Sequence, residues 1–118
     1  MATTTLTSAN FEKTAAGEGI VLVDFWASWC GPCRMFAPVY ERAAEKHEDI
    51  VFGKVDTEAE QDLAARFDIT SIPTIMAIRD GVIVFAQPGA LPEPALENLI
   101  EQVRALDMDD VRSRLAKS

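Results

Sequence analysis

The chain has 118 residues, of which 48% are hydrophobic and 25% are charged. This length predicts one globular domain with a single core and leaves no room for a second domain. The formal net charge of -8 disfavours nucleic acid and anionic membrane surfaces as partners, because like charges repel.

Residues 1–10 lack the basic cluster and the apolar run of a secretory signal, so we expect a cytoplasmic protein. A first short helix is predicted over Ser8–Ala16, with Thr7 or Ser8 as its cap. The dense, β-branched run Ile20–Trp26 predicts a buried strand. It contains an acid and is too short to span a bilayer, so we expect no membrane association.

A long helix is predicted from Pro32 to about His47, because proline suits the first turn of a helix. Pro38 lies inside this helix and predicts a kink, since proline has no N–H to donate. Ile50–Val55 predicts the next strand. Glu58–Phe67 predicts a helix whose acidic first turn suits the helix dipole.

A hairpin and a helix complete the pattern. Thr74–Ile78 and Val82–Phe85 predict two strands, and the Asp-Gly pair within residues 79–81 is a strong hairpin signal. A final helix with an apolar stripe begins at Pro92 or Glu93. Parallel strands joined by a crossover helix, together with an antiparallel hairpin, predict an α/β fold with a mixed sheet.

We expect residues 1–106 to form the domain and residues 107–118 to form a C-terminal extension. Met108, Val111 and Leu115 recur at helical spacing in this extension. It either continues the last helix or adds a turn of its own. The alternative is a frayed polar end.

The chain has only two cysteines, Cys30 and Cys33, placed between the buried strand and the long helix. Unpaired N–H groups at a helix start stabilise a thiolate, the form of cysteine that attacks disulfides. Cys30 is therefore predicted to be the exposed nucleophile, and Cys33 the shielded partner that resolves a mixed disulfide. A tetrahedral metal site needs four ligands, and His47 is the only further candidate of the Cys or His type, so we expect no metal.

Residues 23–33, Val-Asp-Phe-Trp-Ala-Ser-Trp-Cys-Gly-Pro-Cys, resemble the active-site block of the thioredoxin family. Three further motifs of that family follow in order: Lys-Val-Asp at 54–56, Ser-Ile-Pro-Thr at 71–74 and Gly-Ala-Leu at 89–91. The resemblance covers residues 6–106. It implies the thioredoxin fold, a five-stranded mixed β-sheet flanked on both faces by four α-helices.

By this resemblance, the chain is a thiol–disulfide oxidoreductase that reduces disulfides in target proteins through Cys30 and Cys33. The resemblance implies a monomer without a bound cofactor, re-reduced by thioredoxin reductase, an NADPH-dependent flavoenzyme. An oxidase or isomerase of the same fold is one alternative, but these usually carry histidine where this chain has Pro32. A binding protein without turnover is another, and the cysteine pair together with Asp24 and Pro73 disfavours it.

The resemblance also implies roles for two charged residues near the cysteines. Asp24 would be a buried acid with a raised pKa that accepts the proton of Cys33, through a water molecule. The alternative is an aspartate at a strand edge in contact with water. Lys54 would lie beside Asp24 and partly offset the raised pKa, whereas the alternative is a solvated lysine.

The same resemblance predicts the surface that contacts the target polypeptide. Ile72 would offer its backbone to an extended target strand, next to a cis-proline at Pro73, and Gly89 would leave room for that strand. Pro88 is a departure, because the family usually has an apolar residue such as valine there. The residues expected to contact the target are Trp29, Gly31, Pro32, Ile72, Pro73, Gly89 and Ala90.

Overall fold

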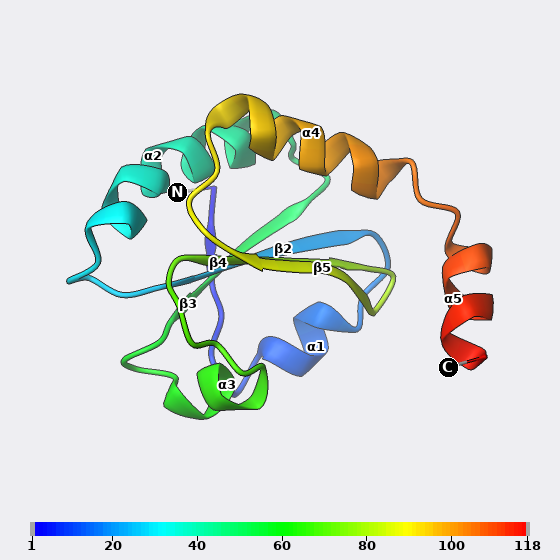
Figure 1. Cartoon of the computed structure of the whole chain (residues 1–118), viewed down its shortest axis with the longest axis horizontal. Helices are drawn as coiled ribbons and strands as arrows, with labels where there is room; N and C mark the ends of the chain where they lie inside the picture. Colours follow the sequence, from blue (N-terminus) through cyan, green and yellow to red (C-terminus); the bar gives the residue numbers. More distant parts are fainter. Residues whose placement is uncertain (1, 118) are drawn as a thin grey trace.

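A five-stranded mixed sheet forms the centre of the computed structural model, which describes residues 2–117 (Figure 1). The strands are β1 (Thr4–Thr5), β2 (Ile20–Trp26), β3 (Val51–Asp56), β4 (Thr74–Arg79) and β5 (Val82–Pro88). Their order across the sheet is β1-β3-β2-β4-β5, so β1 and β5 are the edges. β3 runs parallel to β1 and β2, whereas β4 runs antiparallel to β2 and β5. The predicted α/β class and mixed sheet are confirmed.

Within the described residues the sheet is accompanied by five helices, one more than expected. They are α1 (Phe11–Ala15), α2 (Gly31–Lys46), α3 (Gln61–Arg66), α4 (Glu93–Arg104) and α5 (Met108–Ala116). α2 and α4 cover one face of the sheet, and α1 and α3 cover the other (Figure 1). None of the helices in residues 2–117 is long and apolar enough to cross a membrane.

The C-terminal extension forms the additional helix, α5, and does not prolong α4. Asp107 lies between the two helices and separates them. Its carboxylate accepts hydrogen bonds from the backbone N–H groups of Asp109 and Asp110, and thereby caps a new helix. Met108 is buried, whereas Leu115 is 55% exposed, so α5 packs on the domain mainly through its first residue.

Side-chain hydrogen bonds delay the start of both short helices. The backbone N–H of Thr7 donates to Oδ1 of Asn10 at 2.7 Å, which holds the segment before α1 in a turn. Before α3, the carboxylate of Asp56 accepts a hydrogen bond from the N–H of Glu58 at 2.9 Å. The predicted helix starts at Ser8 and Glu58 were therefore too early, and the cap of α1 is Asn10.

β2 is buried on both faces, as its apolar run predicts. Leu22 packs in the cluster beneath α2 and α4, whereas Val23 packs in the cluster beside α1 and α3. Because side chains alternate along a strand, Asp24 and Trp26 lie on the α2 side. Lys54 is paired in parallel register with Asp24, so its side chain leaves the sheet on that same side.

We predict that Gly53→Ala destabilises the protein. A Cβ atom at this position in β3 would overlap the side chain of Leu6, with Cγ only 2.8 Å away, and Leu6 is buried. Overpacking of this kind costs about 1–3 kcal/mol, which urea unfolding would measure. Gly17→Ala is the matched control, because its Cβ would meet only the carbonyl oxygen of Thr14 at 3.5 Å. Equal unfolding midpoints for the two variants would contradict the overlap.

Candidate functional site

Cys30 and Cys33 form a disulfide at the N-terminal end of α2. Cys30 is the N-cap residue, and its Sγ accepts a hydrogen bond from the backbone N–H of Cys33 at 3.1 Å. Gly31 and Pro32 form the first turn between the two cysteines. Since the N–H groups of a first helical turn have no partner within the helix, they stabilise negative charge on the sulfur of Cys30 after reduction.

Exposure does not distinguish the two cysteines in this disulfide form. Cys30 is 4% exposed and Cys33 is 3% exposed, so the prediction of an exposed Cys30 was wrong for this state. Their positions in the helix do distinguish them, because among the described residues only the sulfur of Cys30 accepts a hydrogen bond from an N–H of the first turn.

The Ile72–Pro73 loop lies against the disulfide. Its peptide bond is cis, as expected, and the carbonyl oxygen of Ile72 lies 3.7 Å from Sγ of Cys30. Gly89 joins this loop by donating its N–H to the carbonyl oxygen of Pro73 at 2.8 Å. With φ of +117°, Gly89 lies in a region that favours glycine, and no described neighbour comes within 4 Å of the place a Cβ would take.

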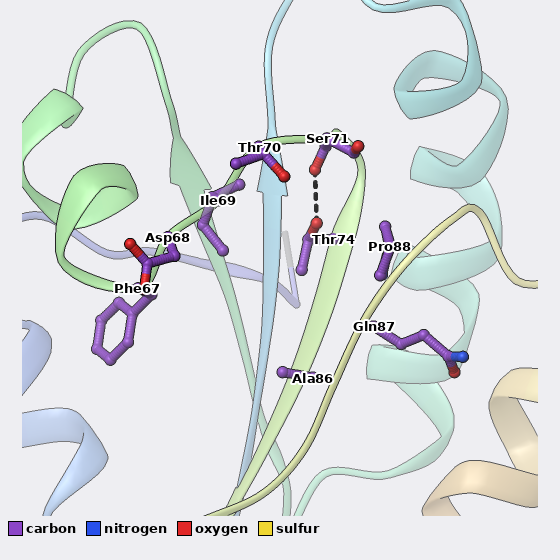
Figure 2. Close-up of a pocket in the computed structure, with 9 residues that line it drawn as sticks. All are labelled: Phe67, Asp68, Ile69, Thr70, Ser71, Thr74, Ala86, Gln87 and Pro88. Atoms are coloured by element: carbon purple, nitrogen blue, oxygen red, sulfur yellow. Dashed lines mark hydrogen bonds between the residues drawn. The ribbon is translucent and has the colours of Figure 1, made fainter.

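A pocket of about 180 Å³ lies beside the same loop (Figure 2). Neither cysteine lines it. The hydroxyl of Thr74 donates to the carbonyl oxygen of Ser71 across its upper wall, which fixes the loop that precedes Pro73 (Figure 2). Pro88 closes the other wall from the end of β5, opposite Thr74.

Asp24 is buried on the α2 side of the sheet, with an exposed fraction of 1%. Neither of its carboxylate oxygens has a hydrogen-bond partner among the described residues. Burial raises the pKa of Asp24 to about 7, and the positive charge of Lys54 acts in the opposite direction. The alternative of a solvated strand-edge aspartate is therefore wrong, and this carboxyl group can exchange a proton near neutral pH.

Lys54 of β3 is the register partner of Asp24 in the sheet. Within residues 2–117, no ion pair joins the two side chains. The ammonium group instead lies 4.9 Å from the centre of the Trp26 ring, in a cation–π arrangement. Lys54 thus acts on Asp24 through space rather than as a hydrogen-bond donor.

Trp29 is 65% exposed beside the disulfide, and its indole Nε1–H donates to Oε1 of Glu58 at 2.9 Å. Glu58 was missed by the sequence analysis, because nothing in its local pattern indicates a contact with residue 29. The guanidinium of Arg34 donates to the carbonyl oxygen of Ser28 at 2.9 Å. Gly31 is half-buried, and Pro32 and Ala90 are exposed.

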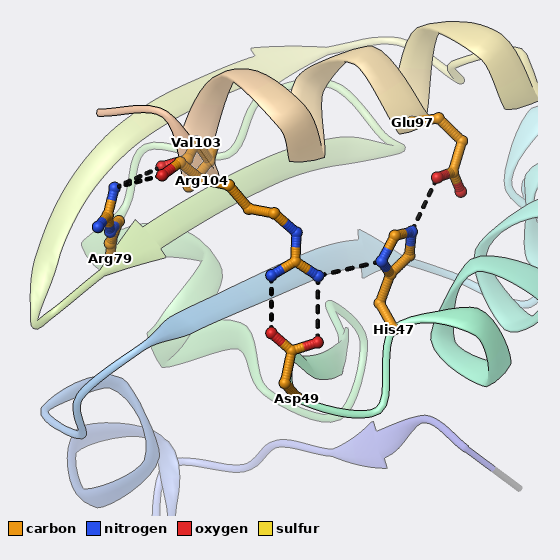
Figure 3. A network of polar contacts seen from close by, with 6 residues as sticks. All are labelled: His47, Asp49, Arg79, Glu97, Val103 and Arg104. Atoms are coloured by element: carbon orange, nitrogen blue, oxygen red, sulfur yellow. Dashed lines mark hydrogen bonds and ion pairs between the residues drawn. The ribbon is translucent and has the colours of Figure 1, made fainter. Parts of the chain in front are cut away.

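His47 lies at the other end of α2 from the cysteines, in a polar network that joins α2 to α4 (Figure 3). Its Nε2 is 2.8 Å from Glu97, and its Nδ1 is 3.1 Å from the guanidinium of Arg104. Arg104 also binds Asp49, and Arg79 caps the end of α4 by donating to carbonyl oxygens there. The network stabilises the packing of the helices.

Comparison with known proteins points to one family. The Thioredoxin family model matches residues 2–102. The chain is 59% identical over 115 residues to a protein of Streptomyces coelicolor named putative thioredoxin 2, covering 98% of this chain and 86% of that one. It is 44% identical over 103 residues to a thioredoxin of Alicyclobacillus acidocaldarius, covering 86% and 98%. The structure of Plasmodium falciparum thioredoxin superimposes with a TM-score of 0.77 at 36% identity, covering 84% and 97%.

We predict that Asp24→Asn stabilises the oxidised protein increasingly as pH rises. Because the pKa of Asp24 is higher in the folded protein than its unfolded value near 3.9, ionisation favours the unfolded state. The wild type should lose stability between about pH 4 and 7, and the loss should level off above pH 7. By pH 8 the difference should reach about 4 kcal/mol.

Urea unfolding of both proteins at pH 4, 6 and 8 measures this difference. Asp68→Asn makes the same chemical change at an exposed site and should show no comparable trend. If the free energies of unfolding of Asp24→Asn and the wild type differed by the same amount at pH 4 and at pH 8, that result would show that the buried carboxylate is not destabilising.

Proposed function

The chain belongs to the thioredoxin family, and from this premise we propose that Cys30 attacks the disulfides of target proteins and Cys33 completes their reduction. The protein is a thiol–disulfide oxidoreductase, a protein-disulfide reductase with a redox-active cysteine pair. The single observation that carries the residue assignment is the Cys30–Cys33 disulfide at the first turn of α2.

In the proposed reaction, the thiolate of Cys30 attacks one sulfur of the target disulfide. A bond forms between Cys30 and that sulfur, and the other target sulfur leaves as a thiolate. The thiolate of Cys33 then attacks Sγ of Cys30 and releases the second target thiolate. The target gains two electrons, and the protein ends with the disulfide that the structure contains.

Asp24 is proposed to accept the proton of Cys33 as that residue becomes a nucleophile. A general base works best when its pKa lies near the operating pH, and burial gives Asp24 a pKa of about 7. Asp24 also lies on the face of the sheet that α2 covers. Lys54 is proposed to limit the rise of this pKa by its charge.

An extended segment of the target is proposed to pair with the backbone of Ile72. The nearness of the Ile72 carbonyl to Cys30 and the open space beside Gly89 support this arrangement. Trp29 is exposed on the same surface and offers an aromatic face to the partner. The further contact residues proposed are Gly31, Pro32, Pro73 and Ala90.

Each cycle leaves a disulfide that a donor of two electrons must reduce again. We infer that this donor is thioredoxin reductase, the NADPH-dependent flavoenzyme, and that the protein works as a monomer in the cytoplasm. Pro32 favours the reducing direction, because it offers the Cys30 thiolate neither a charge nor a hydrogen-bond donor, and a less stable thiolate makes a more easily oxidised dithiol. NADPH oxidation in a mixture of this protein, the flavin reductase and insulin tests the whole route.

We predict that Cys30→Ser abolishes insulin reduction, since it removes the attacking sulfur. Cys33→Ser should instead accumulate a mixed disulfide between Cys30 and the target, because the resolving thiol is lost. Non-reducing gels and mass spectrometry detect this species. Faster alkylation of Cys33 than of Cys30 in the reduced protein would contradict the assigned order of attack.

We further propose that residues 1–106 suffice for activity, and we predict that a chain ending at Leu106 retains full turnover. α5 lies at the opposite end of the molecule from the start of α2 (Figure 1). The truncated protein should lose up to about 1.5–3 kcal/mol of stability, because the buried side chain of Met108 is removed. A large loss of turnover at unchanged stability would show that α5 contacts the partners.

A further inference from the structure

An apolar groove with about 230 Å³ of space lies between α2 and the loop that leads into α4. One water molecule needs only about 10–15 Å³ by this measure, so the groove has room for a side chain. α2 and the loop each supply three of its residues, and all six are uncharged. The lining residues are Met35, Phe36, Val39, Ala90, Leu91 and Pro92.

The α2 wall of the groove lies on the helix face that also carries Cys33. Phe36 follows Cys33 by three positions and Val39 follows Phe36 by three, so these side chains are neighbours along the helix surface. On the other side, the loop begins at Gly89, which is bonded to the carbonyl of Pro73. Both walls of the groove therefore start at the elements that surround the sulfur atoms.

Charged residues end the apolar lining on the side away from the disulfide. Arg42 lies one further step along α2 and forms an ion pair with Glu93 at 3.1 Å, and Lys46 lies 3.9 Å from the same carboxylate. These contacts hold the start of α4 against α2. The groove thus lies between the cysteine end of α2 and the ion pair of Arg42 with Glu93.

The rim of the groove exposes apolar surface to solvent, whereas its floor belongs to the packed core. Met35 is 78% exposed, whereas Phe36 is buried, and Val39 and Leu91 pack partly against the main core. An apolar side chain entering here would contact well-packed core atoms on the floor and an adaptable methionine at the rim. Pro92 restricts the backbone of the wall, which lowers the entropy lost on binding.

The spacing specifies which part of a partner reaches the groove. Cys30 and Phe36 are six residues apart, which is about 9 Å along a helix axis. An extended polypeptide covers about 3.3 Å per residue, so a side chain some two to four residues from a target cysteine bound to Cys30 would lie over the groove.

We propose that this groove binds an apolar side chain of the target polypeptide, two to four residues from the attacked cysteine, and so selects targets with leucine-like residues there. The occupant is a disulfide-bearing extended segment of another protein. The inference rests on the proposed attack by Cys30, because that bond places the segment.

Synthetic peptide disulfides test the proposal, with leucine or serine at positions two, three and four on either side of the cysteine. The reduced protein is mixed with each peptide in a single turnover, and its oxidation is followed by tryptophan fluorescence. The measured quantity is the ratio of the leucine to the serine rate constant, in which general effects on thiol chemistry cancel. At the best position this ratio should be about ten. A tenfold ratio corresponds to the free energy gained when part of one apolar side chain is buried.

Met35→Glu should reduce the ratio towards one, because it places a charge at the rim of the groove. Met35→Leu should retain the preference. Leu115→Glu is the matched control, since it makes the same kind of change at an exposed helical position on α5, and it should leave the ratio unchanged. A ratio near one in the wild type, or an unchanged ratio in Met35→Glu, would overturn the groove proposal.

Two measurements distinguish selection by the groove from a loss of thiol chemistry and from self-association. Hydroxyethyl disulfide is neutral and too small to reach the groove, so failure of the wild type to reduce it would refute the proposed function rather than the groove alone. Sedimentation of the wild type and Met35→Glu identifies self-association. A dimer that Met35→Glu dissociates would show that a second copy occupies the groove, which would also overturn the proposal.

Discussion

α2 packs on the centre of the sheet, against β3 and its neighbour β2, and this contact positions the rest of the site. Phe36 and Tyr40 are fully buried against the α2 side of the sheet, and the hydroxyl of Tyr40 donates to the carbonyl oxygen of Gly53 at 2.8 Å. This packing fixes the direction of α2, whose first turn follows the carboxyl end of β2 after a short loop. The positions of the cysteine pair, of Asp24 on the covered face of the sheet and of the groove along the helix all depend on this single interface.

The same interface contains the least favourable group in the fold. The carboxylate of Asp24 has no hydrogen-bond partner among residues 2–117. Burial raises the pKa of Tyr40, and the charge of Asp24 adds to that rise. A buried ionisable group without a partner costs stability and is retained where chemistry uses it. The large apolar cluster around α2 and α4 offsets this cost, so β2 can carry a destabilising acid on the face that α2 covers.

Sequence patterns predicted the elements whose residues are close in the chain. Local patterns defined three elements: the apolar run of β2, the Asp-Gly turn after Arg79 and the apolar stripe of α4. Family motifs located the cysteine pair and the cis-proline loop. β1 has only two residues, too few to form a pattern, and it was expected only from the family fold. The bond from Trp29 to Glu58, the position of Lys54 over Trp26 and the groove were not predicted, because each joins residues that are brought together only by the sheet register and the helix packing.

The proline at the end of β5 also affects how the molecule behaves among its own copies. Gly89 directs its N–H towards the Pro73 loop, so the preceding residue, Pro88, has its nitrogen on the open edge of the sheet. That nitrogen has no hydrogen to donate. β5 carries no charged residue from 82 to 88, and an uncharged edge strand is a template for pairing with other chains. Pro88 interrupts that template at the end of β5, opposite Thr74, so a strand of another chain cannot complete its backbone hydrogen bonds there. This disfavours aggregation through the β5 edge.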